Sequence, residues 1–469
     1  MNKELNVLGL ISMIIAIIGL FIFGIPCGVT SLILGIIGIA TGCSTETTDP
    51  KVVKVAFAEC GFGRQYLVEW EKGYNAMYPN DPIELDLEGD SQMTQNILTR
   101  ITTETNLPDL VMVLSTNWEA WAVQGYLADL NDVYEADSLD GKGTLMKDFI
   151  EPAILNYGNV NGKYYAVPWS TGPSGIIYNV DMFEKYQWNI PTTYDELVSL
   201  CAKIKTDTKN KVAPFAWSTA TGGYWDYVAL DWWVQYSGHE EYEKFWKFEN
   251  PEVYATEGRK VMLEKFYDLI CDSGKAKNSI VNAKFMTSQM DFINQKAAMI
   301  VNGSWLENEM KENTPEGFRM KMMKTPVISN AKDTTYQVAP TNDFIVIPKK
   351  AKNVEGAKKF LKYINSKEGC EIFTKYAGSF RPFQYDYSNV EGISEFVKSC
   401  ADIKSTTTTL YQYSNNPMYY QNNANLFPGT GSPYVQMVQD DVSGQQMRDD
   451  CYNYAKKNWS SWQKAAGLN

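Results

Sequence analysis

Hydrophobic and polar positions near the start of the chain alternate in a rhythm of short strands and longer helices. Apolar runs at 52–58, 83–87 and 110–114 predict three strands. The last run is apolar throughout, which is typical of a strand buried on both faces of a parallel sheet. Helically spaced apolar residues at 62–78 and 91–103 predict the helices between them. Strand, helix, strand, helix, strand is the order of a doubly wound α/β sheet.

The same kinds of element recur later in the chain. Further predicted elements are strands at 164–167, 175–179, 297–301 and 344–347, and helices at 118–124, 241–273, 284–296 and 355–365. Thr193 and Glu196 have the T-x-x-E spacing of a capping box, which predicts that another helix begins there. The chain after residue 43 is too long for one ordinary core, so we expect two domains.

The N-terminus carries an apolar segment of a different kind. No charged residue occurs between Val7 and Gly42, and the run ends in small residues directly before Cys43. That ending resembles the lipobox of bacterial lipoproteins, in which a peptidase cuts before the cysteine and the thiol carries a diacylglycerol. Cleavage there implies a signal segment at 1–42, a lipidated Cys43 and a flexible tether at 44–50.

The length of this apolar segment permits a second interpretation. It has 36 residues, whereas the apolar region of a signal peptide has about 7–15. Pro26 divides it, and two pairs of glycines, Gly24 with Gly28 and Gly38 with Gly42, have the spacing of closely packed membrane helices. An uncleaved helical hairpin is therefore the alternative to cleavage. Both interpretations place the rest of the chain at a membrane.

Composition narrows the possible functions. The chain has 55 acidic and 43 basic side chains and a net charge of −12, which argues against nucleic acid because its binders present basic surfaces. His239 is the only histidine, so a multi-histidine metal site is excluded. Six cysteines follow Cys43 without a C-x-x-C pair, so zinc and redox motifs are absent. We therefore expect no metal and no cofactor.

Several short motifs, in order, resemble one family. They include Pro108-Asp109 with the strand, helix and Gly125-Tyr126-Leu127 segment that follow, and the blocks at 161–179, 191–197, 295–305 and 344–372. Together they resemble the extracellular solute-binding proteins of ABC sugar importers. The resemblance implies an α/β fold of two doubly wound lobes, like the type II periplasmic binding proteins. Hinge strands join such lobes, and the lobes close over a sugar without breaking a bond.

The resemblance also implies a domain division and a ligand. It places one lobe at 51–167 plus 326–385 and the other at 168–325 plus 386–469. Residues 187–205 and 303–318 are similar to the branch that binds N-acetylglucosamine and N,N′-diacetylchitobiose. The implied protein is a lipoprotein on the extracellular face of the cell membrane. Its implied partners are a mono- or oligosaccharide and the permease subunits of the importer.

A sugar site needs rings for the flat C–H faces and polar groups for the hydroxyls. In open α/β sheets, ligands bind beyond the carboxyl ends of strands, and suitable residues follow the predicted strands. These are Glu59, Phe62, Asp90, Gln92, Asn117, Trp118, Ser304 and Trp305. The crossing between lobes and the hinge strand add Trp169, Asn342 and Asp343, and a cluster of rings at 217–233 adds Trp225.

Other functions and ordinary structural roles remain open at this point. A tethered glycoside hydrolase also combines rings with two carboxylates, about 5–10 Å apart, although no such pair stands out in the sequence. A glycan sensor or adhesin without transport is the other alternative. Trp118 is equally suited to packing against Trp121. Trp232 and Trp233 cannot face the same way on one helix, so we expect only about half of the ring cluster to belong to the core.

Overall fold

The computed structural model describes residues 51–90, 93–114, 116–340, 343–421 and 423–468. The predicted signal segment 1–42, Cys43 and the tether 44–50 lie outside these residues, as do Gln92 and Asn342. Within the described ranges, no helix combines the length and the apolar character needed to cross a membrane.

The first sheet contains the strands predicted near the start of the chain. Its order is β2 (Ile83–Asp90), β1 (Lys51–Ala58), β3 (Leu110–Val113), β17 (Phe344–Val346) and β8 (Ala166–Pro168). Helices α3 (Gln65–Met77) and α4 (Met93–Thr103) connect the first three strands, so the predicted βαβ order is confirmed. Helix α3 buries Tyr66, Leu67, Trp70 and Tyr74, which recur at helical spacing on one face.

The direction of the strands brings several chain ends to one edge of this sheet. β1 is parallel to β2 and β3, whereas β17 is antiparallel to β3 and β8. Phe344, the first residue of β17, therefore pairs with Val113 and Pro168, which end β3 and β8. As a result, residues that follow β1, β2, β3 and β8 and those that precede β17 share an edge.

The second sheet has the same design. Its order is β13 (Ser279–Asn282), β10 (Ala213–Ser218), β14 (Ala297–Gly303), β9 (Ser174–Asn179) and β15 (Met320–Met323). β10 is parallel to β13 and β14, whereas β9 is antiparallel to β14, so Gly303 at the end of β14 pairs with Ser174 at the start of β9. Residues that follow β10 and β14 therefore lie at one edge.

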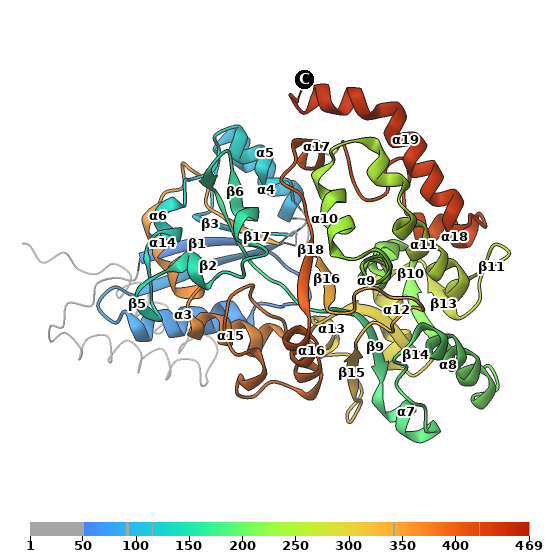
Figure 1. The fold of residues 1–469 in the computed structure, drawn as a ribbon. Coiled ribbons are helices and arrows are strands. Elements are labelled where there is room, and N and C mark those ends of the chain that lie inside the picture. The colour runs from blue at the N-terminus through green and yellow to red at the C-terminus, as the bar shows by residue number, and fades with distance from the viewer. Residues whose placement is uncertain (1–50, 91–92, 115, 341–342, 422, 469) are drawn as a thin grey trace, which may run out of the picture. The chain divides into compact units, whose positions relative to one another are not determined.

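Helices complete the packing around each sheet. α14 (Val354–Ile364) and α15 (Lys367–Ala377) pack with α3, from which they are far apart in the sequence (Figure 1). Around the second sheet, α8 (Tyr194–Asp207) begins with the predicted capping box, in which Thr193 accepts from the Glu196 backbone and Glu196 accepts from the Thr193 backbone.

Helix α9 (Asp226–Ser237) differs from the expectation for the ring cluster. Trp232 and Trp233 are both fully buried, because α9 packs against α11 (Glu257–Ile270), α10 (His239–Lys247) and strand β16 (Tyr336–Pro340) on different sides. Neighbouring residues of one helix do point in different directions, but here both directions lead into the core.

Several segments pass between the two lobes, among them residues 384–389, which run from the first core to the second. Residues 169–173 run from β8 to β9, β16 leads into β17, and β18 (Thr408–Gln412) pairs in parallel with β16. The core around the first sheet takes in residues from 53 to 169 and from 339 to 383, while the second sheet is covered mainly by residues from 176 to 338 and from 390 to 466. The lobe boundaries at 167, 325 and 385 stay predictions.

The structure contains further helices and strands. They are α5 (Trp118–Val123), α6 (Asn131–Tyr134), β4 (Asp137–Ser138), β5 (Gly141–Leu145), β6 (Asn159–Val160), β7 (Lys163–Tyr164), α7 (Val180–Tyr186), β11 (Cys271–Asp272), β12 (Lys275–Ala276), α12 (Phe285–Ile293), α13 (Leu306–Met310), α16 (Glu395–Thr406), α17 (Pro417–Tyr420), α18 (Pro433–Gln439), α19 (Gly444–Ala465) and the 3₁₀ helices η1 (Met146–Phe149), η2 (Leu155–Gly158), η3 (Thr219–Trp225), η4 (Pro251–Ala255) and η5 (Tyr387–Asn389).

Candidate functional site

Four aromatic rings meet where the strand ends of both sheets contribute loops. Trp305, which follows β14, lies edge-to-face with Phe62, Tyr224 and Tyr227 at centroid distances of 6.4, 6.1 and 6.1 Å. We call these four residues the aromatic cluster. Phe62 is buried, whereas Trp305, Tyr224 and Tyr227 are only half-buried. The cluster therefore keeps part of its ring surface accessible to a ligand.

Two glycines allow the loops to approach this closely. A Cβ atom on Gly303 would lie 2.1 Å from the ring of Trp305, and one on Gly61 would lie 2.9 Å from the same ring. The side chain of Asn308 on α13 also donates a hydrogen bond of 2.7 Å to the Gly61 carbonyl. The absence of side chains at both glycines thus lets the loop after β1 lie against Trp305.

Two half-buried carboxylates lie beside the cluster. Asp343 directly precedes β17, and its Oδ2 accepts a hydrogen bond of 2.6 Å from the Ser170 hydroxyl. Burial raises the pKa of Asp343 to about 6, although the bond from Ser170 opposes the rise. Glu309 on α13 accepts from Gln289, and burial raises its pKa as well. Burial and then the charge of Glu309, with a smaller effect of Asp343, raise the pKa of Tyr224.

Three other predicted contacts lie at the expected sheet edge. Glu59 is exposed and forms an ion pair of 2.5 Å with Arg64. Its backbone N–H donates to the Asp90 carbonyl at 3.3 Å, and the Asp90 side chain accepts from Asn96. Asn117 is half-buried at the start of α5 and forms no side-chain cap there. The three residues therefore lie where the strand-end rule places them.

Four predicted contacts are buried in this structure. Trp118 packs on Phe344 at 5.3 Å between centroids, and Trp169 lies edge-to-face with Phe62 at 5.4 Å. The hydroxyl of Ser304 donates a hydrogen bond of 2.9 Å to the hydroxyl of Ser379, which is not a residue of the aromatic cluster. The fourth, Trp225, packs among other rings of the second core. A ligand-binding role for these four stays a prediction.

Sequence reasoning did not select three residues of this region as ligand contacts, although it places Tyr224 in the ring cluster at 217–233. Tyr224 and Tyr227 follow β10, and β10 is not among the predicted strands. The strand-end rule would have selected both tyrosines, had its apolar run at 213–217 been recognised. Glu309 lies on a helix, four residues after Trp305, and no local pattern distinguishes it from a solvated charge.

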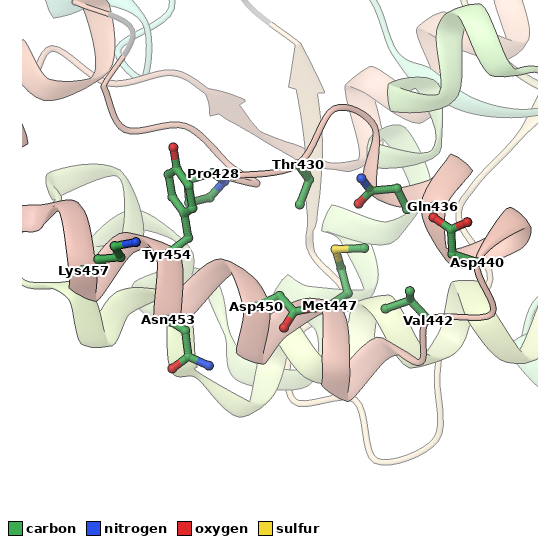
Figure 2. A pocket seen from close by; sticks show the side chains of 11 residues that line it. Pro428, Thr430, Gln436, Asp440, Val442, Met447, Asp450, Asn453, Tyr454 and Lys457 are labelled. Atoms are coloured by element: carbon green, nitrogen blue, oxygen red, sulfur yellow. The ribbon is translucent and has the colours of Figure 1, made fainter.

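A pocket of about 510 Å³ lies away from the aromatic cluster, between α18, α19 and the loop at 428–430. Figure 2 shows its lining side chains, which include Gln436, Asp440, Asp450 and Tyr454. None of the predicted site residues lines it. Across the described part of the chain, no group of three or more His, Cys, Asp or Glu side chains is placed to hold a metal ion.

Known proteins resemble this chain in sequence and in fold. The Multiple sugar-binding protein of Streptococcus mutans is 26% identical over 282 residues, which are 58% of this chain and 62% of that protein. The Diacetylchitobiose binding protein NgcE of Streptomyces coelicolor is 25% identical over 256 residues, 53% of this chain and 52% of that protein. The chain thus spans less than two thirds of the length of these two relatives.

The fold is that of a solved binding protein. The apo form of RafE from Streptococcus pneumoniae has a TM-score of 0.62 at 18% identity, over 88% of this chain and 99% of that one. The family model described as "Bacterial extracellular solute-binding protein" matches residues 57–369, which is more than half of the chain. The protein therefore belongs to the family of bacterial extracellular solute-binding proteins.

Proposed function

We propose that the protein is the sugar-binding component of an ABC importer and that it holds the sugar against the aromatic cluster. The observation that carries this proposal is the half-buried ring surface of Trp305, Tyr224 and Tyr227 beside two carboxylates. Rings stack on the C–H faces of a sugar, and carboxylates accept from its hydroxyls. Among the contacts predicted from sequence, Phe62, Trp305 and Asp343 belong to this arrangement.

The favoured ligand is an acetamido sugar, either N-acetylglucosamine or a chito-oligosaccharide. Two observations support this choice. Residues 187–205 and 303–318 resemble the corresponding branch of the family, and one relative is named for diacetylchitobiose. The name of the other relative, a multiple sugar-binding protein, supports the wider class of carbohydrate ligands.

Delivery of the sugar requires a movement of the lobes. The connecting segments, which include residues 169–173, the passage from β16 to β17, residues 384–389 and β18, are few, which suits hinge closure around a ligand. In the proposed cycle, closure buries the sugar and creates the surface that the permease subunits recognise. The chain itself breaks no bond, and the family match supports binding over hydrolysis.

The first prediction tests binding against catalysis. Titration calorimetry of the full-length protein with glucose, maltose, N-acetylglucosamine and N,N′-diacetylchitobiose should show saturable binding, strongest for an acetylated sugar. Chromatography of the same mixtures should show no new product. Release of monosaccharide would favour the hydrolase alternative, whereas preference for a sugar without an acetamido group would remove only the acetamido assignment.

The second prediction concerns Trp305. Replacing it by alanine should weaken sugar binding by about 1 kcal/mol or more, roughly five-fold in Kd, because a central aromatic anchor is lost. Calorimetry with the preferred sugar measures the change, and circular dichroism checks that the fold is retained. Tyr454→Ala is the matched control, since this exposed ring lines the wide pocket of Figure 2. An unchanged Kd for Trp305→Ala, or a larger loss for the control, would contradict the proposed site.

The third prediction is a pH dependence. The ionised form of Asp343 accepts hydrogen bonds from hydroxyls at both oxygens, whereas protonation turns one oxygen into a donor. Because burial raises its pKa to about 6, sugar affinity should be full above that pH and should fall as the pH drops below it. Asp343→Asn should flatten the profile, measured by tryptophan fluorescence titrations between about pH 5 and pH 8. Glu309→Gln is the control for the second carboxylate, and an Asp343→Asn profile that retains the full slope would exclude Asp343 as the titrating group.

We further propose that the protein is a lipoprotein held at the membrane through Cys43. The small residues before Cys43 and the polar segment 44–50 after it support this anchor, and the extracellular family is consistent with it. Mass spectrometry of the protein purified from its native membrane should show a mature chain that begins at an acylated Cys43. A chain that retains Met1 would show instead that the apolar segment is the anchor.

A further inference from the structure

A small pocket adjoins the aromatic cluster and shares Tyr224 with it. The pocket lies where β10, β14, η3 and α12 meet, and its lining includes Trp217, Tyr224, Trp225, Phe285 and Asn302. Its volume is about 10 Å³, which is enough for one water-sized group and too little for a sugar ring. The centroid of the Tyr224 ring lies 5.7 Å from that of Phe285 in the pocket wall and 6.1 Å from that of Trp305 in the cluster.

Two side chains of this pocket carry buried donors that have no acceptor among the described residues. Asn302 is fully buried, and its Oδ1 accepts from the Gly303 backbone N–H at 2.8 Å. That bond orients the amide, so Nδ2 is the group without a partner. Trp225 is 1% exposed, and its Nε1 has no acceptor either. An unsatisfied buried donor destabilises the structure, so both groups favour a ligand that supplies an acceptor.

The chemistry of the pocket indicates which acceptor fits. A carbonyl oxygen accepts two hydrogen bonds, which matches two unpaired donors. The wall also contains the hydroxyls of Ser218 and Ser288, which already bond the Ala220 backbone N–H and the Phe285 carbonyl. The neighbouring Trp217 already uses its Nε1 on Ser279 at 2.9 Å, so it contributes only an apolar wall, as Phe285 does. A single carbonyl oxygen therefore suits both the two donors and the volume of the pocket.

We propose that this pocket receives the carbonyl oxygen of an acetamido group, with Asn302 Nδ2 and Trp225 Nε1 as the donors. The sugar ring that carries the group lies against the aromatic cluster, and the short acetamido arm reaches past Tyr224. The inference rests on the proposed function and deepens it, because it names the part of the protein that favours the binding of acetylated sugars over unacetylated ones. Trp225 then acts through its N–H, although its ring belongs to the core.

The test compares two disaccharides with the same linkage. Full-length protein in a detergent without a sugar headgroup is titrated with N,N′-diacetylchitobiose and with cellobiose, which lacks both acetamido groups. Trp225→Phe removes one donor and keeps a ring, and Asn302→Asp keeps the acceptor for Gly303 but removes the other donor. Each should raise Kd for diacetylchitobiose about five-fold, the effect of one lost hydrogen bond, and leave Kd for cellobiose within about two-fold.

Trp217→Phe is the matched control, because it changes the same wall at a donor that Ser279 already occupies. It should leave the affinity for diacetylchitobiose within about two-fold. Equal losses for both disaccharides, or a loss for Trp217→Phe as large as that for Trp225→Phe, would overturn the assignment of the acetamido group. Wild-type protein that binds another sugar but not diacetylchitobiose would overturn this inference alone, whereas binding to no sugar would overturn the proposed function itself.

Discussion

The antiparallel insertion of β17 between β3 and β8 is the constraint on which the candidate site depends. A parallel strand at this position would begin at the opposite edge of the sheet. Because β17 runs the other way, its first residue lies beside the ends of β3 and β8. Asp343 therefore reaches the edge at which the loop after β1 presents Phe62. The backbone bond of 2.8 Å from Trp169 to the Asp343 carbonyl continues this pairing into the crossing segment.

Buried polar groups hold the crossing segments in place. Glu151 forms an ion pair of 2.7 Å with the buried Lys404 and accepts from Tyr411 at 2.6 Å, so it joins the first lobe to β18 and α16. On the other side, Asp231 of α9 accepts from the Val338 backbone in β16 at 2.7 Å, and burial raises its pKa to about 7. Removing one partner of such a contact would leave a buried polar or charged group unpaired, which is costly.

The aromatic residues of this chain serve two roles that differ in how much of the ring is covered. Most tryptophans lie in the cores, where they contribute buried area and edge-to-face contacts. Trp305 is different because the glycines at 61 and 303 let it lie between loops of the two sheets while part of its ring stays accessible. Trp225 combines both roles in the proposed scheme, since its ring packs in the core while its N–H donates a hydrogen bond to the ligand.

The sequence by itself determined the α/β class, the first three strands with their helices, the capping box at Thr193 and the family resemblance. These features are local or depend on the order of short motifs, so periodicity and motif spacing reveal them. Tertiary structure alone decided which rings are accessible. Trp118 and Trp305 both follow a strand at the same kind of position, yet Trp118 packs on Phe344 while Trp305 stays half-buried. Burial depends on neighbours that are distant in the sequence. The placement of two unsatisfied donors, at Asn302 and Trp225, in the wall of one pocket likewise depends on β10 and β14 lying side by side.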